Sequence, residues 1–240
     1  MRIQNSKLKI QNCIFGLADY LHPRLKKKTQ KEALEVFEVL KKEYPDPKTE
    51  LFYEDPFQLL IAVILSAQCT DAQVNKTTPA LFKKYPTAQK MAKAPIADLE
   101  KLIHSCGFYR NKAKSILSAS QDLVEKFKGK VPSSLEELVQ LAGVGRKTAS
   151  VVLNQAFDEP AIAVDTHVAR VSARLGWVKT KTAEKIELEL RELLPQTLWA
   201  AVNGTLILHG RKLCKAQRPL CTECPVNKLC PSAFKFPNFG

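Results

Sequence analysis

One stretch of the chain is apolar on every side: it runs from Phe57 to Leu65, with Gln58 as its one polar residue, and it directly follows Pro56. A proline suits the first turn of a helix, where its missing N–H is not needed. A helix that is apolar all around has to be covered by other elements. Because the run is far shorter than the ~20 residues of a membrane span, we expect a buried central helix and no membrane partner.

The sequence around this run repeats a pattern of helix, short loop and helix. From Lys31 onward, apolar residues recur three and four positions apart, as on one face of an amphipathic helix. Helices are also predicted over residues 96–103 and from Asn111 to just before Gly129. No segment shows convincing strand alternation, so we predict an all-α protein whose 240 residues form one large domain or two modest ones.

Several residues mark where helices should begin. Thr70-Asp-Ala-Gln73 and Ser133-Ser-Leu-Glu136 have the spacing of capping boxes, in which the first side chain caps the helix. Pro79 is expected at another helix start. Residues 1–28 are polar and end in a basic run, so they are predicted to form an irregular N-terminal extension.

The charge balance favours a polyanionic partner. Lys and Arg number 37 against 24 Asp and Glu, a formal net charge of +13. Such an excess favours nucleic acid first and an anionic membrane surface second. The N-terminus has no apolar signal-peptide core. We therefore expect a cytoplasmic protein, associated with the nucleoid of a bacterium or archaeon, while an organellar or nuclear location stays open.

Residues 141–149 join two predicted helices through Gly143 and Gly145. Two glycines one residue apart allow a tight turn and let the backbone approach another molecule. The second helix is expected to begin at Arg146, with free N–H groups that can bind a phosphate. A plain corner between two helices is the alternative. A Walker-type phosphate loop is excluded because its spacing and its preceding strand are absent.

Four of the seven cysteines crowd together near the C-terminus: Cys214, Cys221, Cys224 and Cys230. Zinc accepts four thiolates, usually from two close pairs. Only one close pair occurs here, and the irregular spacing suits a cubic iron–sulfur cluster better. The other cysteines are expected to be ordinary thiols: Cys13, Cys69 and Cys106.

Basic residues lie in or beside this cysteine loop, and the first acid after them is Glu223. They are Lys212, Lys215 and Arg218. We expect the loop to present a basic surface, braced by the metal, that contacts DNA backbone phosphates.

Six motifs follow one another between about Lys31 and Cys230. They are Ser66-Ala-Gln-Cys-Thr-Asp71, Gly107-Phe-Tyr-Arg-Asn-Lys-Ala113, Gly143-Val-Gly-Arg-Lys-Thr-Ala149, Val164-Asp-Thr-His167, Leu206-Ile-Leu-His-Gly-Arg211 and the four-cysteine loop. Together they resemble the endonuclease III family, DNA glycosylases and abasic-site lyases of the helix-hairpin-helix superfamily. The resemblance implies a two-lobed fold: a six-helix barrel lobe over residues 49–159, and an iron–sulfur cluster lobe made of residues 29–48 and 160–240.

The same resemblance implies a monomeric base-excision repair enzyme that carries a [4Fe–4S] cluster and acts on double-stranded DNA with damaged bases or abasic sites. It would remove oxidised pyrimidines and cleave the abasic site on its 3′ side, by β-elimination through a lysine Schiff base. The nucleophile would be Lys147, helped to lose its proton by partial burial and by the helix dipole. The catalytic carboxylate would be Asp165. From the residues alone, Lys147 could equally bind a phosphate, and Asp165 could be a helix N-cap.

The resemblance also implies residues that fill the space left by an extruded nucleotide. Gln68 would insert into the duplex, and Phe108 would be a second wedge opposite the orphaned base. The alternatives are that Gln68 bonds a loop carbonyl at a helix end and that Phe108 belongs to the core. Asp71 would line the entry to the base pocket or simply cap the next helix.

One departure from the family pattern is Ala142, which stands where a proline often precedes the hairpin glycine; we expect a modestly looser turn. Two other functions remain open. An adenine glycosylase acting opposite 8-oxoguanine shares the hairpin, the aspartate and the cysteine spacing, but normally lacks a lysine at the position of Lys147. A non-enzymatic, structure-specific DNA-binding protein would bind DNA without chemistry.

Overall fold

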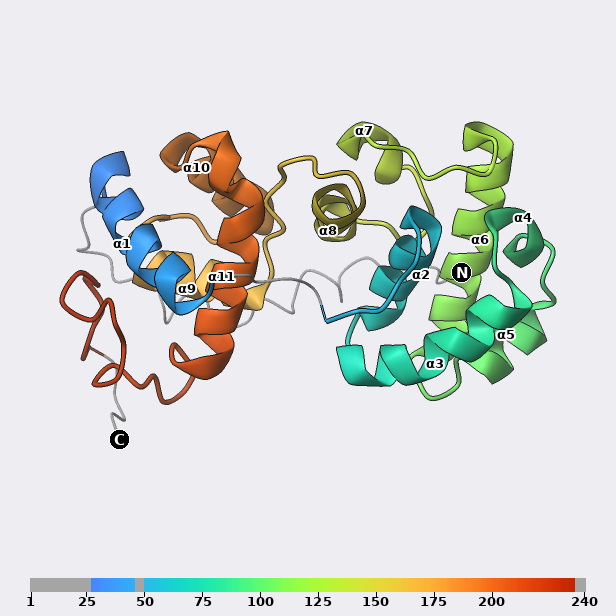
Figure 1. Ribbon diagram of the computed structural model, residues 1–240, viewed down its shortest axis with the longest axis horizontal. Coiled ribbons are helices and arrows are strands. Elements are labelled where there is room, and N and C mark those ends of the chain that lie inside the picture. The colour runs from blue at the N-terminus through green and yellow to red at the C-terminus, as the bar shows by residue number, and fades with distance from the viewer. Residues whose placement is uncertain (1–26, 46–49, 236–240) are drawn as a thin grey trace, which may run out of the picture. The chain divides into compact units, whose positions relative to one another are not determined.

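The computed structural model describes residues 27–45 and 50–235 (Figure 1). Every regular element in these residues is helical, which confirms the all-α prediction. The chain divides into two compact units: unit 1 comprises Met1–Pro47 and Val164–Gly240, and unit 2 comprises Lys48–Ala163. No helix of the described residues is both long and apolar enough to span a bilayer.

Two predictions about chain organisation are not decided by this division. The extension predicted over residues 1–28 lies outside the described residues, apart from its last two positions. The two lobes were predicted over residues 49–159, and over residues 29–48 together with 160–240. Their roles as a barrel lobe and a cluster lobe stay a prediction.

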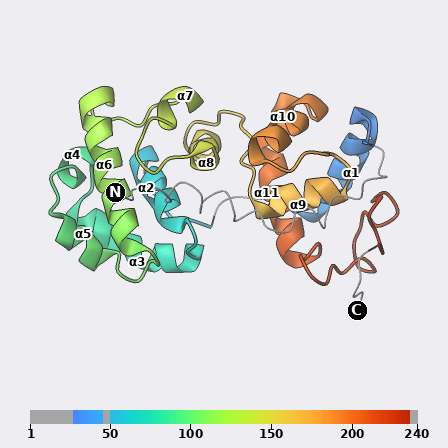
Figure 2. The same cartoon turned by 180° about the vertical axis from the view of Figure 1, so that it is seen from behind.

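Unit 2 is built around α2 (Pro56–Ser66), the helix predicted to be central. Every residue of α2 from Phe57 to Leu65 is buried, and α2 packs against α3, α6 and α8. The other helices of unit 2 are α3 (Asp71–Lys84), α4 (Ala88–Met91), α5 (Ile96–Leu102), α6 (Tyr109–Phe127), α7 (Leu135–Leu138) and α8 (Arg146–Ala156). Figure 2 shows the long helix α6 beside α4 and α5, against which it packs.

Side-chain caps fix where the helices of unit 2 begin. Thr70 Oγ1 accepts the backbone N–H of Gln73 at 3.2 Å, so the predicted N-cap of α3 is confirmed. The prediction for α7 was wrong by one residue, because Ser134 and not Ser133 is its N-cap. Its hydroxyl accepts the N–H of Glu137 at 3.3 Å. The run of two serines and two glutamates fits either register, and burial of Leu138 selects the observed one.

Pro79 does not start a helix; it lies inside α3. A proline in a helix interior removes one backbone hydrogen bond. Buried residues on both sides of it, Val74 and Leu81, hold α3 against the core of unit 2. Packing of this face therefore outweighs the break that a proline favours.

In unit 1, α11 (Trp199–Lys212) packs against α1 (Gln30–Glu43) and α9 (Thr166–Arg174). The predicted apolar face of α1 is confirmed, since its four residues are fully buried: Ala33, Val36, Phe37 and Leu40. The remaining helices of unit 1 are α10 (Ala183–Leu193) and the 3-10 helix η3 (Gln196–Leu198). After α11, residues 213–235 contain no helix or strand and form the loop that carries the four cysteines.

The close packing of α9 against α11 depends on one glycine. A Cβ added to Gly210 would lie 2.9 Å from Nδ1 of His167 and 3.1 Å from Nη2 of Arg170. At these distances the side chains of His167 and Arg170 would have to shift to admit a methyl group. The absence of a side chain at Gly210 therefore leaves room for these two side chains of α9 beside α11.

Candidate functional site

The hairpin between α7 and α8 is held by buried apolar side chains and by one glycine. Leu141 and Val144 are buried in the core of unit 2. Gly143 has a φ of +75°, and a Cβ added there would lie 2.7 Å from Cβ of Ser115 on α6. The turn thus lies against α6 only because position 143 has no side chain.

Ala142 strengthens the hairpin in a way that the family's proline could not. Its backbone N–H donates to Oδ2 of Asp122 on α6, at 3.2 Å. The other oxygen of Asp122 is 2.6 Å from Nζ of Lys126. A proline has no N–H to donate. The loosening expected from Ala142 is therefore offset by a tie to α6.

Helix α8 begins at Arg146, as predicted, and its first turn is open. Gly145 is the N-cap and supplies no side-chain hydrogen bond. Nothing lies within 4 Å of a Cβ added to Gly145. The first-turn amides and the positive end of the helix dipole can therefore receive an anion. Lys147 lies in this turn and is exposed, so the expected partial burial was wrong.

Asp165 is the N-cap of α9, as one of the two roles predicted for it requires. Its Oδ1 accepts the backbone N–H of Val168 at 2.7 Å, and the side chain is half-buried. Burial lowers the pKa of the nearby His167, while the charge of Asp165 acts in the opposite direction. The N-cap bond fixes the carboxylate at the start of α9, in unit 1, whereas Lys147 belongs to unit 2.

The two predicted wedge residues lie in two short loops of unit 2. We call residues 67–70 the Gln68 loop and residues 103–108 the Phe108 loop. Both named residues are exposed, with left-handed φ values of +54° and +58°. Phe108 is 65% exposed, so its alternative role as a core aromatic was wrong. Asp71 does not cap α3, because Thr70 does.

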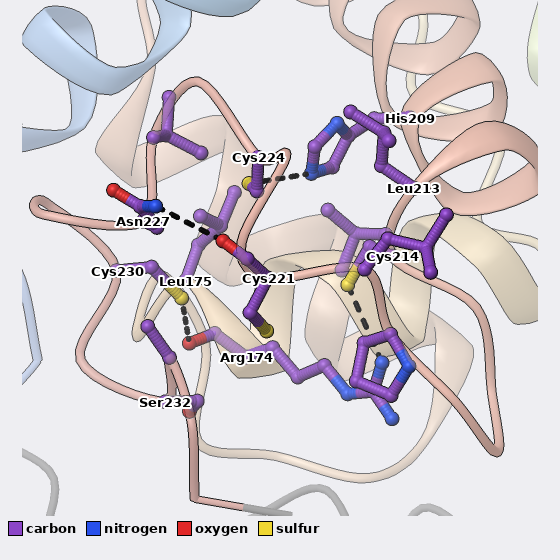
Figure 3. Close-up of a pocket in the computed structure, with 15 residues that line it drawn as sticks. Arg174, Leu175, His209, Leu213, Cys214, Cys221, Cys224, Asn227, Cys230 and Ser232 are labelled. Atoms are coloured by element: carbon purple, nitrogen blue, oxygen red, sulfur yellow. Dashed lines mark hydrogen bonds between the residues drawn. The ribbon is translucent and has the colours of Figure 1, made fainter. Parts of the chain in front are cut away.

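The four clustered cysteines line a single cavity in unit 1 (Figure 3). The other lining residues come from α9, α11 and the loop itself, and include Arg174, His209 and Leu213. Within the described residues, no three His, Cys, Asp or Glu side chains converge closely enough to hold one metal ion. The four thiols thus surround one cavity, the arrangement that a polynuclear cluster requires.

Comparison with known proteins gives the same family as the motifs. The family model described as "HhH-GPD superfamily base excision DNA repair protein" matches residues 61–196, and "Iron-sulfur binding domain of endonuclease III" matches residues 214–230. The endonuclease III of Synechocystis sp. is 51% identical over 85% of this chain and 94% of its own. That of Escherichia coli is 42% identical over 82% and 93%. The chain belongs to the endonuclease III family.

Solved structures of this family agree. A "Trapped Endonuclease III-DNA Covalent Intermediate" has a TM-score of 0.82 and 45% identity, and the match covers 87% of this chain and 98% of that one. The protein is therefore a base-excision repair enzyme, a DNA N-glycosylase and abasic-site lyase that carries a [4Fe–4S] cluster.

The cysteine cavity fits the cluster of the endonuclease III family electrostatically. Burial raises the pKa of Cys224 to about 11 and that of Cys230 to about 12. Thiols in such surroundings become thiolates only beside positive charge, which iron supplies. Hydrogen bonds from the backbone act in the opposite direction to burial. The N–H of Val226 lowers the pKa of Cys224, and the N–H of Ser232 lowers that of Cys230.

Two buried arginines of α9, absent from our sequence predictions, hold the start of the cysteine loop. Arg174 Nη1 donates to the sulfur of Cys214 at 3.3 Å and to the carbonyl of Lys215 at 2.7 Å. Nε of Arg170 donates to the carbonyl of Cys214 at 3.1 Å. The signal was present in the sequence, since two arginines four residues apart on an otherwise small and apolar helix face imply buried polar partners.

His209 on α11 is the other missed residue at the cavity. It is buried, its Nε2 lies 3.7 Å from the sulfur of Cys224, and its Nδ1 lies 3.4 Å from the hydroxyl of Tyr44. Burial lowers its pKa to about 4, so the ring is neutral at pH 7. A neutral imidazole can connect α1 to a cysteine without adding a charge.

The predicted basic residues of the loop are all exposed: Lys212, Lys215 and Arg218. Lys212 ends α11 and its Nζ lies 5.3 Å from the ring centre of Tyr44. The loop backbone beneath Lys215 and Ala216 is fixed by the guanidinium of Arg174. The charged end of the exposed Lys215 side chain therefore projects from a backbone segment that is anchored to the interior by Arg174.

Proposed function

We propose that this enzyme excises oxidised pyrimidines from duplex DNA and then cuts the strand 3′ to the abasic site, with Lys147 as the nucleophile. The observation that carries the proposal is the exposed lysine in the open first turn of α8. A trapped covalent intermediate in a similar structure fits a mechanism through an enzyme nucleophile. Lys147 also favours this activity over that of an adenine glycosylase.

The amine of Lys147 attacks C1′ of the damaged nucleotide, the N-glycosidic bond breaks, and the base leaves. Only the neutral amine can attack C1′. Ring opening gives a Schiff base between Nζ and C1′. The iminium acidifies the C2′ proton, and its removal expels the 3′ phosphate by β-elimination.

Asp165 stabilises the positive charge that builds up on the sugar as the base departs. Its attachment to the N–H of Val168 fixes the carboxylate before substrate arrives. This preorganisation is worth more than a mobile charge, because no reorientation is needed during the reaction.

Other proposed contacts position the DNA. The amides around the hairpin bind one backbone phosphate, at Gly143, Gly145 and Arg146. The exposed cations of the cysteine loop bind further phosphates: Lys212, Lys215 and Arg218. Gln68 and Phe108 fill the space left by the extruded nucleotide, and Asp71 lines the entry to the base pocket.

The proposed ligands of the cluster are the four thiolates that line the cavity: Cys214, Cys221, Cys224 and Cys230. When bound, the cluster supplies four iron atoms that crosslink residues 214–230, and in this proposal it does no chemistry on DNA. Arg174 and Arg170 hold the same backbone from the interior side. We further propose that the enzyme acts as a monomer at the bacterial nucleoid.

The decisive experiment compares Lys147→Gln with Asp165→Asn in single-turnover assays. Lys147→Gln should abolish borohydride trapping and strand cleavage, with DNA binding and the cluster intact. Asp165→Asn should slow excision of thymine glycol by about 10²–10³ and affect a preformed abasic site less. A wild-type level of trapped adduct in Lys147→Gln would identify another amine as the nucleophile.

The phosphate contacts have a separate test in the salt dependence of binding. Each ion-paired phosphate contributes about −0.9 to the slope of log K against log salt. Lys215→Met should reduce that slope by about one and weaken binding to lesion and undamaged duplexes equally. A loss confined to lesion DNA would mean that Lys215 contacts the damage.

A further inference from the structure

The Gln68 loop and the Phe108 loop each carry a cysteine beside the exposed wedge residue. Cys69 is half-buried and packs against the core of unit 2, and Cys106 is fully buried. The thiol of Cys106 donates to Oγ1 of Thr77 at 3.6 Å. Neither cysteine belongs to the set that lines the cluster cavity.

The two loops are in direct contact. Nε2 of Gln73, in the first turn of α3, donates to Oγ of Ser105 at 2.9 Å. A Cβ added to Gly107 would lie 4.0 Å from the carbonyl oxygen of Gln68. Burial raises the pKa of Cys106, the hydrogen bond with Thr77 acts against this, and the charge of Cys69 adds to the rise. The two cysteines therefore lie on loops that contact each other.

A buried lysine accompanies the two thiols. Lys112, in the second turn of α6, is 6% exposed, and its Nζ has no hydrogen-bond partner within the described residues. Burial lowers its pKa, while charge on Cys69 and Cys106 raises it, which places the ammonium within electrostatic reach of both sulfurs. A buried cation of this kind favours a thiolate nearby.

We propose that Cys69 and Cys106 are a peroxide-sensitive dithiol, whose oxidation to a disulfide links the Gln68 loop to the Phe108 loop, with Lys112 as a buried positive charge beside the reacting sulfurs. Cys69 reacts first, because it is the accessible member of the pair. Cys106 is the resolving thiol, protected from solvent until its neighbour has been oxidised.

The chemistry balances with hydrogen peroxide as the oxidant. The Cys69 thiolate attacks one oxygen, the O–O bond breaks, and a sulfenic acid and one water form. The sulfur of Cys106 then attacks that of Cys69, the S–O bond breaks, and the departing hydroxide takes the Cys106 proton as a second water. Two thiols lose two electrons in total, and one peroxide is reduced to two waters.

The link would act on DNA recognition, and this part of the inference rests on the proposed wedge roles of Gln68 and Phe108. Both residues hold a left-handed backbone conformation at the surface of their loops. A covalent bond one residue from Gln68 and two residues from Phe108 prevents the loops from separating as a duplex is opened. Oxidation should therefore slow excision reversibly, under conditions that leave the cluster in place.

The chemical test needs no DNA. The full-length holoprotein is treated with stoichiometric hydrogen peroxide while the cluster absorbance is followed, then alkylated and digested with trypsin. A crosslink between the peptides of residues 49–76 and 102–110, released by dithiothreitol, is the expected result. Separate alkyl labels on Cys69 and Cys106, or loss of the cluster before any crosslink, would overturn the proposal.

Variants test the role of each group. Cys69→Ser and Cys106→Ser should each abolish the crosslink. Lys112→Met should slow its formation several-fold, because it removes the buried ammonium that lies within electrostatic reach of both sulfurs. Lys112→Arg keeps the charge and should retain the rate, as should the matched control Lys114→Met, on an exposed position of the same helix. Equal rates in all three lysine variants would remove Lys112 from the mechanism.

The functional arm compares excision by the oxidised and reduced protein. Oxidised wild type should lose activity that dithiothreitol restores, whereas peroxide-treated Cys106→Ser should keep the rate of its untreated form. A mapped crosslink with unchanged excision would refute the coupling to DNA recognition. An enzyme inactive on every lesion even when reduced would refute the proposed function and leave the mapped dithiol standing.

Discussion

The hairpin at residues 141–146 and the cysteine loop at residues 213–235 both present an irregular backbone for the proposed DNA contacts, but different forces hold them. Apolar side chains and the fit of Gly143 against Ser115 hold the hairpin. The cysteine loop is held by the buried guanidinium of Arg174, by backbone carbonyls and by thiols around a cavity. The hairpin is therefore held by apolar packing, and the cysteine loop by charged and polar groups.

This difference shows which parts of the interface depend on the cofactor. The hairpin needs only groups within unit 2, so its shape is complete when that core has formed. Burial raises the pKa of two of the loop's thiols strongly, so those thiols lose their protons only when iron is present. Loss of the cluster should therefore affect the phosphate contacts of unit 1 and spare those of the hairpin.

The largest effect is expected from removing a cluster ligand. Cys230→Ser should lose iron and sulfide, and its unfolding free energy should fall by more than about 4 kcal/mol, since loss of a structural metal is among the most damaging changes. Residues 213–235 should become sensitive to protease while residues 50–163 stay protected. Cys69→Ser, outside the cavity, should keep full iron content. Equal proteolysis of both regions would contradict the comparison.

A smaller effect is expected from Arg174→Met. The change keeps most of the volume but leaves the carbonyls of Lys215 and Ala216 without their donor. It should cost about 3 kcal/mol, or roughly 6–12 °C in Tm, by thermal unfolding of the holoprotein. Arg218→Met, at an exposed position of the same loop, should stay within about 0.5 kcal/mol. Similar losses in the two variants would show that buried charge does not hold the loop.

The smallest effect concerns the hairpin itself. Gly143→Ala combines a φ of +75° with a Cβ that approaches Ser115, and should cost about 2 kcal/mol. Gly145→Ala meets nothing within 4 Å and should leave stability within about 0.5 kcal/mol, while it weakens DNA binding. Chemical denaturation measures the change in unfolding free energy, and titration with duplex DNA measures the change in binding. A stable Gly143→Ala protein would mean that packing does not fix this turn.

The fold was largely predictable because its strongest signals are local. The apolar run of α2, the periodic face of α1 and the glycine hairpin each specify an element without knowledge of distant residues. Where local signals were ambiguous, tertiary packing decided. Val74 and Leu81 keep α3 continuous through Pro79, and burial of Leu138 selects Ser134 as a cap.

The surroundings of the site were harder to predict, because they depend on residues far apart in the chain. Arg174 and Cys214, forty residues apart, meet because α9 packs against α11. Cys69 and Cys106 were predicted to be ordinary thiols, and only the contact between their loops brings them together. The exposure of Lys147 likewise follows from the geometry of an uncapped helix start, which the spacing of residues does not reveal.

One helix, α6, connects two of the surfaces that are proposed to contact DNA. Its N-cap is Phe108, its residue Ser115 lies against Gly143, and Asp122 accepts the N–H of Ala142. At about 1.5 Å per residue, Ser115 lies roughly 10 Å and Asp122 roughly 21 Å along the axis from Phe108. Helix α6 thus sets the distance between the proposed wedge residue Phe108 and the proposed phosphate-binding hairpin. One residue inserted between Phe108 and Ser115 would turn these two features by about 100° relative to each other.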